Sequence, residues 1–258
     1  MTSSRPSIAE LRAVCQPQSV IGRPSAEHWA GRWYMRRLSI HVTRLLLNAP
    51  VSPNGLTVLM MAVGVVGAVA AAWPGVGTAV AAAVLIQAYL LLDCVDGEVA
   101  RWRRVTSAAG VFLDRLGHYV AEAALLVAIG LRADGGPAEL GLWSWVGAVA
   151  AVVALLGKTQ NDLVAVARSG AGLGELGEGD EQPSRSALRG VRGLVHRLPV
   201  HRMVGAIELS LLLVVAAVID AVTGELVATR VLILAAAVVG SIVALLHPVF
   251  ILSSRRLR

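Results

Sequence analysis

Residues 76–101 read VGTAVAAAVLIQAYLLLDCVDGEVAR, an apolar run that reaches its first charge at Asp93 and ends in a cluster of charged residues. The run is long enough for a helix across the ~30 Å hydrocarbon core of a bilayer. A helix is expected because every backbone donor and acceptor in lipid must be satisfied within the segment. The stretch therefore predicts a membrane-spanning helix with acidic groups at one end.

The rest of the chain shares this apolar character. Hydrophobic residues make up 56% of the 258 residues and charged residues only 16%. A soluble domain of this length has too little core to hide so much apolar surface. We expect an all-α, polytopic membrane protein with six transmembrane helices, at about 55–73, 76–95, 107–131, 140–156, 203–222 and 227–252.

The basic residues are unevenly distributed among the segments that connect these spans. Twenty of the 23 lie before the first span, after the second and fourth spans, or in the tail. By the positive-inside rule these segments face the cytoplasm, so both termini are predicted to be cytoplasmic. The basic residues are nearly all Arg, which suggests a GC-rich bacterial genome. We expect the protein to lie in the inner (cytoplasmic) membrane. The net charge of +6 then indicates contact with anionic headgroups and no nucleic acid partner.

Two domains are expected. Residues 1–50 form a cytoplasmic leader, in which the alternation of Arg-bearing turns with apolar residues over 26–48 predicts an interfacial amphipathic helix. An ordinary juxtamembrane anchor is the alternative, and one helix can serve both roles. Residues 51–258 form the six-span domain, with a flexible cytoplasmic loop rich in Gly, Glu and Ser at about 169–200.

Charged residues gather on one face at the end of the second span. Asp93, Asp96, Gly97, Ala100 and Arg101 are spaced i, i+3, i+4, i+7 and i+8, so they share one helix face. The small residues leave that face open to a bulky substrate, although small residues also favour tight helix packing in membranes. Helix packing does not explain the aspartates.

A second polar stripe runs along the third span. Gly110, Asp114, His118 and Glu122 follow one another at intervals of four, and a short hairpin lets this stripe face the first. A lone carboxylate in a bilayer costs several kcal/mol, about 3 on insertion scales, and facing carboxylates would also repel. A divalent metal is the simplest remedy, and oxygen ligands favour Mg²⁺ or Mn²⁺ over Zn²⁺.

These residues resemble the signature of the CDP-alcohol phosphotransferase (CDP-alcohol phosphatidyltransferase) family, D-x-x-D-G-x-x-A-R followed by G-x-x-x-D-x-x-x-D. The first part is complete from Asp93 to Arg101, and the second runs from Gly110 through Asp114. Ser52-Pro53-Asn54-Gly55-Leu56-Thr57 is similar to the start of the family's first membrane helix. Ser107, three residues before Gly110, also fits the family's usual surroundings.

The resemblance implies a specific reaction. Family members bind the pyrophosphate of a CDP-alcohol through two divalent metals, a hydroxyl of a second alcohol attacks the β-phosphorus, and CMP leaves. By position, Asp93, Asp96 and Asp114 would be metal ligands. The donor nucleotide would be bound by Asn54, Thr57, Gly97, Ala100, Arg101, Ser107 and Gly110. The family also implies a homodimer.

The chain departs from the signature at its last position, where His118 replaces an aspartate proposed as general base. His118 could itself be the base, because an imidazole has an unperturbed pKa of about 6.5, and Glu122 could orient its ring. It could instead be a nitrogen ligand of the second metal. A third alternative is a degenerate site that binds nucleotide but transfers poorly.

The expected function is transfer of a substituted phosphate from a CDP-alcohol, CDP-diacylglycerol first, to a small hydroxylated acceptor such as an inositol phosphate or glycerol phosphate. A soluble CDP-polyol donor is the alternative within this class. Arg36 and Arg37, with Arg189, Arg192, Arg197 and Arg202, could bind an anionic acceptor or simply touch lipid phosphates. A membrane scaffold with a vestigial site and a transporter are the rival functions.

Overall fold

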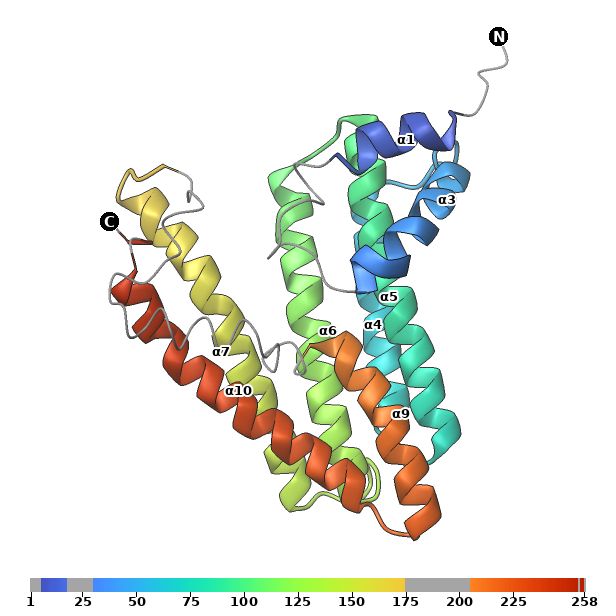
Figure 1. The fold of residues 1–258 in the computed structure, drawn as a ribbon, viewed down its shortest axis with the longest axis vertical. Coiled ribbons are helices and arrows are strands. Elements are labelled where there is room, and N and C mark those ends of the chain that lie inside the picture. The colour runs from blue at the N-terminus through green and yellow to red at the C-terminus, as the bar shows by residue number, and fades with distance from the viewer. Residues whose placement is uncertain (1–5, 18–29, 175–204, 255, 258) are drawn as a thin grey trace. The chain divides into compact units, whose positions relative to one another are not determined.

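The computed structural model describes residues 6–17, 30–174, 205–254 and 256–257. The secondary structure of these residues is helical, without a β-strand (Figure 1). The expected loop at 169–200 lies outside the described residues from residue 175 onward, as do the basic residues of that loop and the first residues of the predicted amphipathic segment.

Six helices among the described residues are long and apolar enough to cross a membrane, which confirms the predicted fold class. They are α4 (Pro53–Ala71), α5 (Val76–Arg103), α6 (Ala108–Asp134), α7 (Leu142–Gly170), α9 (Ala206–Thr223) and α10 (Val227–Ser253). Helices α5 and α7 continue well past the ends predicted for their spans, so the whole acidic motif of α5 is helical. The predicted start of the fifth span, at residue 203, lies outside the described part of the chain.

Shorter helices precede the first span. A π-helical turn, η1 (Gly31–Met35), leads into α3 (Arg36–Leu46), within the segment predicted to be amphipathic. An additional helix, α1 (Ile8–Cys15), was not predicted from the polar leader. It begins with a capping box, and Leu11 and Cys15 pack fully buried against Ile40 of α3.

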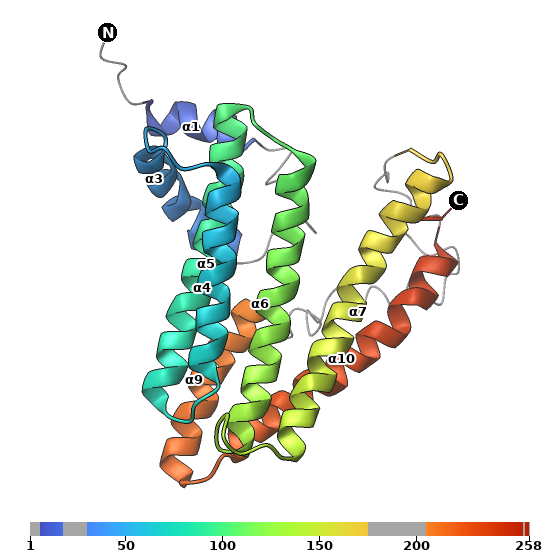
Figure 2. The same ribbon diagram turned by 180° about the vertical axis from the view of Figure 1, so that it is seen from behind.

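The chain divides into two compact units. One comprises Met1–Gly67 with Val84–Ala121, and therefore holds α1, η1, α3 and the motif-bearing parts of α5 and α6. The other comprises Ala68–Ala83 with Glu122–Arg258. Within this second unit α7 and α10 lie side by side, and α9 also contacts α10 (Figures 1 and 2).

A carboxylate at the end of one helix caps the start of the next in both hairpins of the second unit. Asp134 of α6 accepts hydrogen bonds from the backbone N–H and the hydroxyl of Ser144, at 2.7 and 2.6 Å. Asp220 of α9 accepts from the backbone N–H of Ala228 at 2.7 Å and from the Thr229 hydroxyl at 2.5 Å. The first N–H groups of a helix have no partner within the helix, so each aspartate fixes where the following helix begins.

Helices α6 and α7 approach each other closely at two glycines. A Cβ placed on Gly130 would lie 2.6 Å from the carbonyl oxygen of Trp143 and 2.8 Å from the Cα of Gly147. Real side chains do not tolerate such distances, so only glycine permits the two backbones to meet here.

The first prediction concerns the cap of α10. We expect Asp220→Ala to destabilise the protein by about 2 kcal/mol, because the carboxylate is buried and leaves several donors unsatisfied when removed. Thermal unfolding in detergent measures the effect. Glu225→Gln, an exposed carboxylate of the same connection, is the control and should leave the melting temperature unchanged. Equal melting temperatures for Asp220→Ala and the control would contradict the assigned role.

Candidate functional site

The two predicted polar stripes meet where α5 ends and α6 begins. The connection is a tight turn in which Arg104 adopts a left-handed conformation, with φ 54°. The hydroxyl of Ser107 then accepts a hydrogen bond from the backbone N–H of Gly110 at 3.1 Å, which fixes the first turn of α6. This short connection explains why residues of the two stripes come within contact distance.

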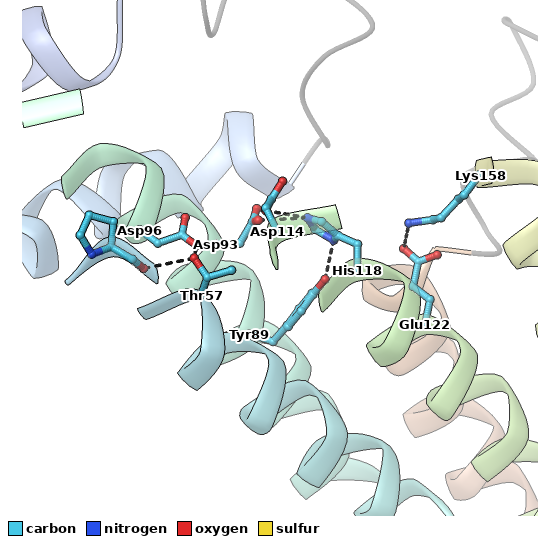
Figure 3. A network of polar contacts seen from close by, with 9 residues as sticks. Thr57, Tyr89, Asp93, Asp96, Asp114, His118, Glu122 and Lys158 are labelled. Carbon is cyan, nitrogen blue, oxygen red and sulfur yellow. Dashed lines mark hydrogen bonds and ion pairs between the residues drawn. The ribbon is translucent and has the colours of Figure 1, made fainter. Parts of the chain in front are cut away.

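Three of the predicted site residues form one cluster. Asp93 of α5 and Asp114 and His118 of α6 each offer a ligand atom, and these atoms all lie within 4.8 Å of one another. The Nε2 of His118 lies 3.0 Å from an oxygen of Asp93 and 3.6 Å from an oxygen of Asp114. Figure 3 shows the imidazole directed toward both carboxyl groups.

The chemistry of this cluster fits a divalent cation. Two carboxylates and an imidazole nitrogen are a common ligand set for divalent metals. Neighbouring carboxylates on apolar helices repel each other and are costly without a compensating positive charge. The side chains of Asp93, Asp114 and His118 are 24%, 44% and 30% exposed, so a ligand can reach them.

Asp96 is not one of the three clustered residues. It is nearly buried, and its carboxylate accepts a hydrogen bond from the hydroxyl of Thr57 on α4 at 2.6 Å (Figure 3). The Thr57 hydroxyl is also 3.1 Å from the carbonyl oxygen of Pro53. The two signature residues Thr57 and Asp96 thus contact each other directly, and this contact ties α4 to the motif of α5.

Three more of the predicted nucleotide-binding residues lie close together at the start of α6. The site of a Cβ on Gly110 is 3.2 Å from the side-chain oxygen of Asn54 and 3.4 Å from the hydroxyl of Ser107. The absence of a side chain at Gly110 therefore lets the Asn54 amide approach the α6 backbone. Asn54, Ser107 and Gly110 therefore lie beside one another in the first unit.

Arg101 and Gly97 form a second pair. The Arg101 side chain folds back over its own helix, so that a Cβ on Gly97 would lie 3.1 Å from a guanidinium nitrogen. Its Nε donates a 2.7 Å hydrogen bond to the carbonyl oxygen of Cys15, which caps the end of α1. Ala100, one turn from Gly97 on α5, is half-buried.

Glu122, expected as an orienting partner of His118, has a cationic partner of its own. Its carboxylate accepts a 2.7 Å hydrogen bond from Lys158 of α7, the only lysine in the sequence. Glu122 thus forms an ion pair with Lys158. That Glu122 orients the His118 ring stays a prediction.

Glu98 is a polar centre that was not predicted from the sequence. It is fully buried, and it accepts hydrogen bonds from Ser39 at 2.6 Å, Thr43 at 2.7 Å and Gln16 at 2.8 Å. Arg36 lies 3.5 Å from the same carboxylate. One side chain of α5 therefore holds the leader segment and α3, because an ionised group is stable in the interior only when such donors surround it.

A signal for Glu98 was present in the sequence. Ser39 and Thr43 are spaced i, i+4 on the predicted amphipathic helix, and Glu98 is an acidic residue of the motif without a family role. Tyr89, whose hydroxyl contacts the Nδ1 of His118, had no comparable signal, since a lone tyrosine in an apolar span is ordinary.

In the part of the chain that the structure describes, six helices of membrane-spanning length, two of which carry a cluster of metal-ligating side chains, define a polytopic membrane protein with a polar site. Residues 50–174 match the family model for CDP-alcohol phosphatidyltransferase, and the protein therefore carries a domain of that family. Members transfer a phosphatidyl group from a CDP-alcohol and generally use a divalent metal. A search of curated proteins finds no match.

The second prediction tests the Glu98 centre through Cys15. Burial of the thiol, reinforced by the Glu98 carboxylate, raises the pKa of Cys15 to about 11, although Arg101 acts in the opposite direction. In a Cys94→Ala background, Glu98→Ala should increase the rate of Cys15 alkylation at neutral pH by about 10-fold or more, because both the burial and the nearby charge are lost. Mass spectrometry after timed maleimide treatment measures this rate.

The control for this experiment is Glu225→Ala, which removes an exposed carboxylate. Its alkylation rate should equal that of the Cys94→Ala parent. If Glu98→Ala also leaves the rate unchanged, Glu98 does not hold α1 in place.

Proposed function

We propose that this protein is a membrane transferase that moves the phosphatidyl group of CDP-diacylglycerol to a small hydroxylated acceptor and releases CMP. The observation that carries the proposal is the cluster of Asp93, Asp114 and His118 inside a CDP-alcohol phosphatidyltransferase domain. Proposed acceptors are an inositol phosphate or glycerol phosphate. We further propose the bacterial inner membrane, cytoplasmic termini and a homodimer.

The metal would be Mg²⁺ or Mn²⁺, held by Asp93, Asp114 and His118. When bound, it would neutralise the pyrophosphate and the charge that develops on the departing CMP phosphate. A second ion would require Asp96 as a ligand. Because the Asp96 carboxylate already accepts a hydrogen bond from Thr57, it would have to bind the ion and the Thr57 hydroxyl at the same time.

The nucleotide would lie along the small-residue face of α5. Gly97 and Ala100 leave room there, and Arg101 supplies a planar fork of N–H donors for phosphate. Asn54, Ser107 and Gly110 would complete the nucleotide site from α4 and the start of α6. The contact between Arg101 and the Cys15 carbonyl supports this role, because it holds the guanidinium over Gly97.

In the transfer step the acceptor oxygen forms a bond to the β-phosphorus of the donor. The bond from that phosphorus to the bridging oxygen breaks, and CMP leaves with the bond's electron pair. We assign the acceptor's proton to Asp114, which is the most exposed of the three clustered side chains. His118 has partners on both ring nitrogens, Tyr89 on Nδ1 and Asp93 on Nε2, and this favours a ligand role over a role as base.

An anionic acceptor requires cationic groups near the cluster. Arg36 is the described residue best suited to this role, since it is partly exposed and lies beside Glu98 at the same end of α5. Arg37, which is exposed on α3, would assist it. The basic residues expected to help from the loop before α9 lie outside the described residues.

The rival functions make different predictions in one assay. Purified protein is incubated with Mg²⁺, CDP-diacylglycerol or a soluble CDP-alcohol, and a panel of acceptors, and products are identified by mass spectrometry. A transferase releases CMP and one new product. A vestigial scaffold, or a transporter, gives no product across the panel, and that result would refute the proposal.

The third prediction concerns the first aspartate of the motif. Asp93→Asn keeps the shape of the side chain but removes its charge, so we expect CMP release to fall by about 100-fold or more. The matched control is Glu225→Gln, which should retain full activity. Activity of Asp93→Asn within twofold of the parent would exclude this carboxylate from the reaction.

The fourth prediction concerns the nucleotide face. Gly97→Ala places a methyl group 3.1 Å from the Arg101 guanidinium, so the arginine must shift, and we expect the KM for the CDP donor to rise by about 10-fold. Gly77→Ala lies on the same helix, where an added Cβ meets nothing within 4 Å, and its KM should not change. Steady-state kinetics with varied donor distinguish the two. An unchanged KM for Gly97→Ala would remove this face from the nucleotide site.

A further inference from the structure

Tyr89 is a neighbour of the cluster that no motif of the sequence marks. Its side chain is 2% exposed, and its hydroxyl contacts the Nδ1 of His118. The two rings meet edge to face, with centroids 5.6 Å apart and an interplanar angle of 88°. Figure 3 shows the tyrosine on one side of the imidazole and the two carboxyl groups on the other side.

The position of the Tyr89 ring is set by packing. A Cβ on Gly64 of α4 would lie 2.9 Å from a ring carbon of Tyr89 and 2.9 Å from the Cβ of Ala121. Gly64 thus makes room for the aromatic ring between α4 and α6. A phenol held in this way has little freedom to turn, so its hydroxyl is a fixed partner for Nδ1.

The two ring nitrogens of His118 have different partners, which indicates a different role for each. Nδ1 faces the phenolic oxygen, which can accept a hydrogen bond from an N–H group. Nε2 faces the carboxylates of Asp93 and Asp114, the position from which a metal would be ligated. A proton on Nδ1 leaves the lone pair of Nε2 free to bind a cation, as in metal sites whose histidines are oriented by an outer hydrogen bond.

We infer that Tyr89 is a positioning residue that holds His118 as a nitrogen ligand, and that the resulting site binds Mn²⁺ in preference to Mg²⁺. This inference rests on the proposed function, because it concerns the metal of the same site. Mg²⁺ prefers oxygen ligands and keeps its water shell, whereas imidazole binds first-row transition metals well. One ring nitrogen in place of a carboxylate also removes a negative charge, which weakens the binding of a hard cation most.

The fifth prediction is tested by metal binding without turnover. The purified full-length protein is titrated with Mn²⁺, binding is followed by electron paramagnetic resonance, and Mg²⁺ is added as competitor. We expect Tyr89→Phe to weaken Mn²⁺ binding by about 10-fold, the usual effect of losing an outer hydrogen bond, and to leave Mg²⁺ binding within about twofold. His118→Asp, with only carboxylates, should lower the ratio of Mn²⁺ to Mg²⁺ affinity by about 10-fold.

Tyr119→Phe is the matched control, because it removes a phenolic hydroxyl one residue after His118, and its Mn²⁺ affinity should equal that of the parent. Melting temperatures confirm that each variant is folded. If Tyr89→Phe does not fold, His118→Asp still tests the ion preference. An unchanged affinity ratio in His118→Asp, or equal Mn²⁺ affinities in Tyr89→Phe and Tyr119→Phe, would overturn the inference. Mn²⁺ preference without CMP release would instead refute only the proposed function.

Discussion

An ionised carboxylate in a membrane protein needs donors, a counterion or water, and most polar contacts of this protein follow from that requirement. Glu98 is surrounded by donors, and Asp96 has the Thr57 hydroxyl. Asp93 and Asp114 are different, because they lie close together and both face the single imidazole of His118. Asp93 and Asp114, which have the fewest groups to balance their negative charge, are also more exposed than Asp96 and Glu98. Their unmet need for positive charge is what distinguishes a binding site from structural polar contacts.

The N-terminal residues contribute to the site although the family match begins at residue 50. Glu98 and Arg101 alternate with the small residues of the α5 motif, and both are held by the segment before α4. Gln16 and Ser39 donate to Glu98, and the Cys15 carbonyl accepts from Arg101. The orientation of the arginine proposed to bind phosphate therefore depends on its contact with Cys15, 86 residues earlier in the sequence.

Sequence alone was sufficient where the signal is local. Hydropathy predicted the six spans, and the spacing of Asp93, Asp114 and His118 correctly predicted that two stripes would meet. It was insufficient where long-range contacts decide the structure. Helix α1 was not predicted, because the apolar partner that stabilises it, Ile40, is far away in the chain. The Tyr89–His118 contact could not be predicted either, since it depends on how the helices pack.

The close approach of Gly130 and Gly147 has a mechanical consequence for α6 and α7. Because the two backbones are in contact at this point, a change in the angle between the helices would pivot about it. Glu122 lies about 12 Å along α6 from the crossing, and Lys158 about 16 Å along α7. Because their ion pair lies far from the contact point, a small change in the angle between the helices would separate the two charges.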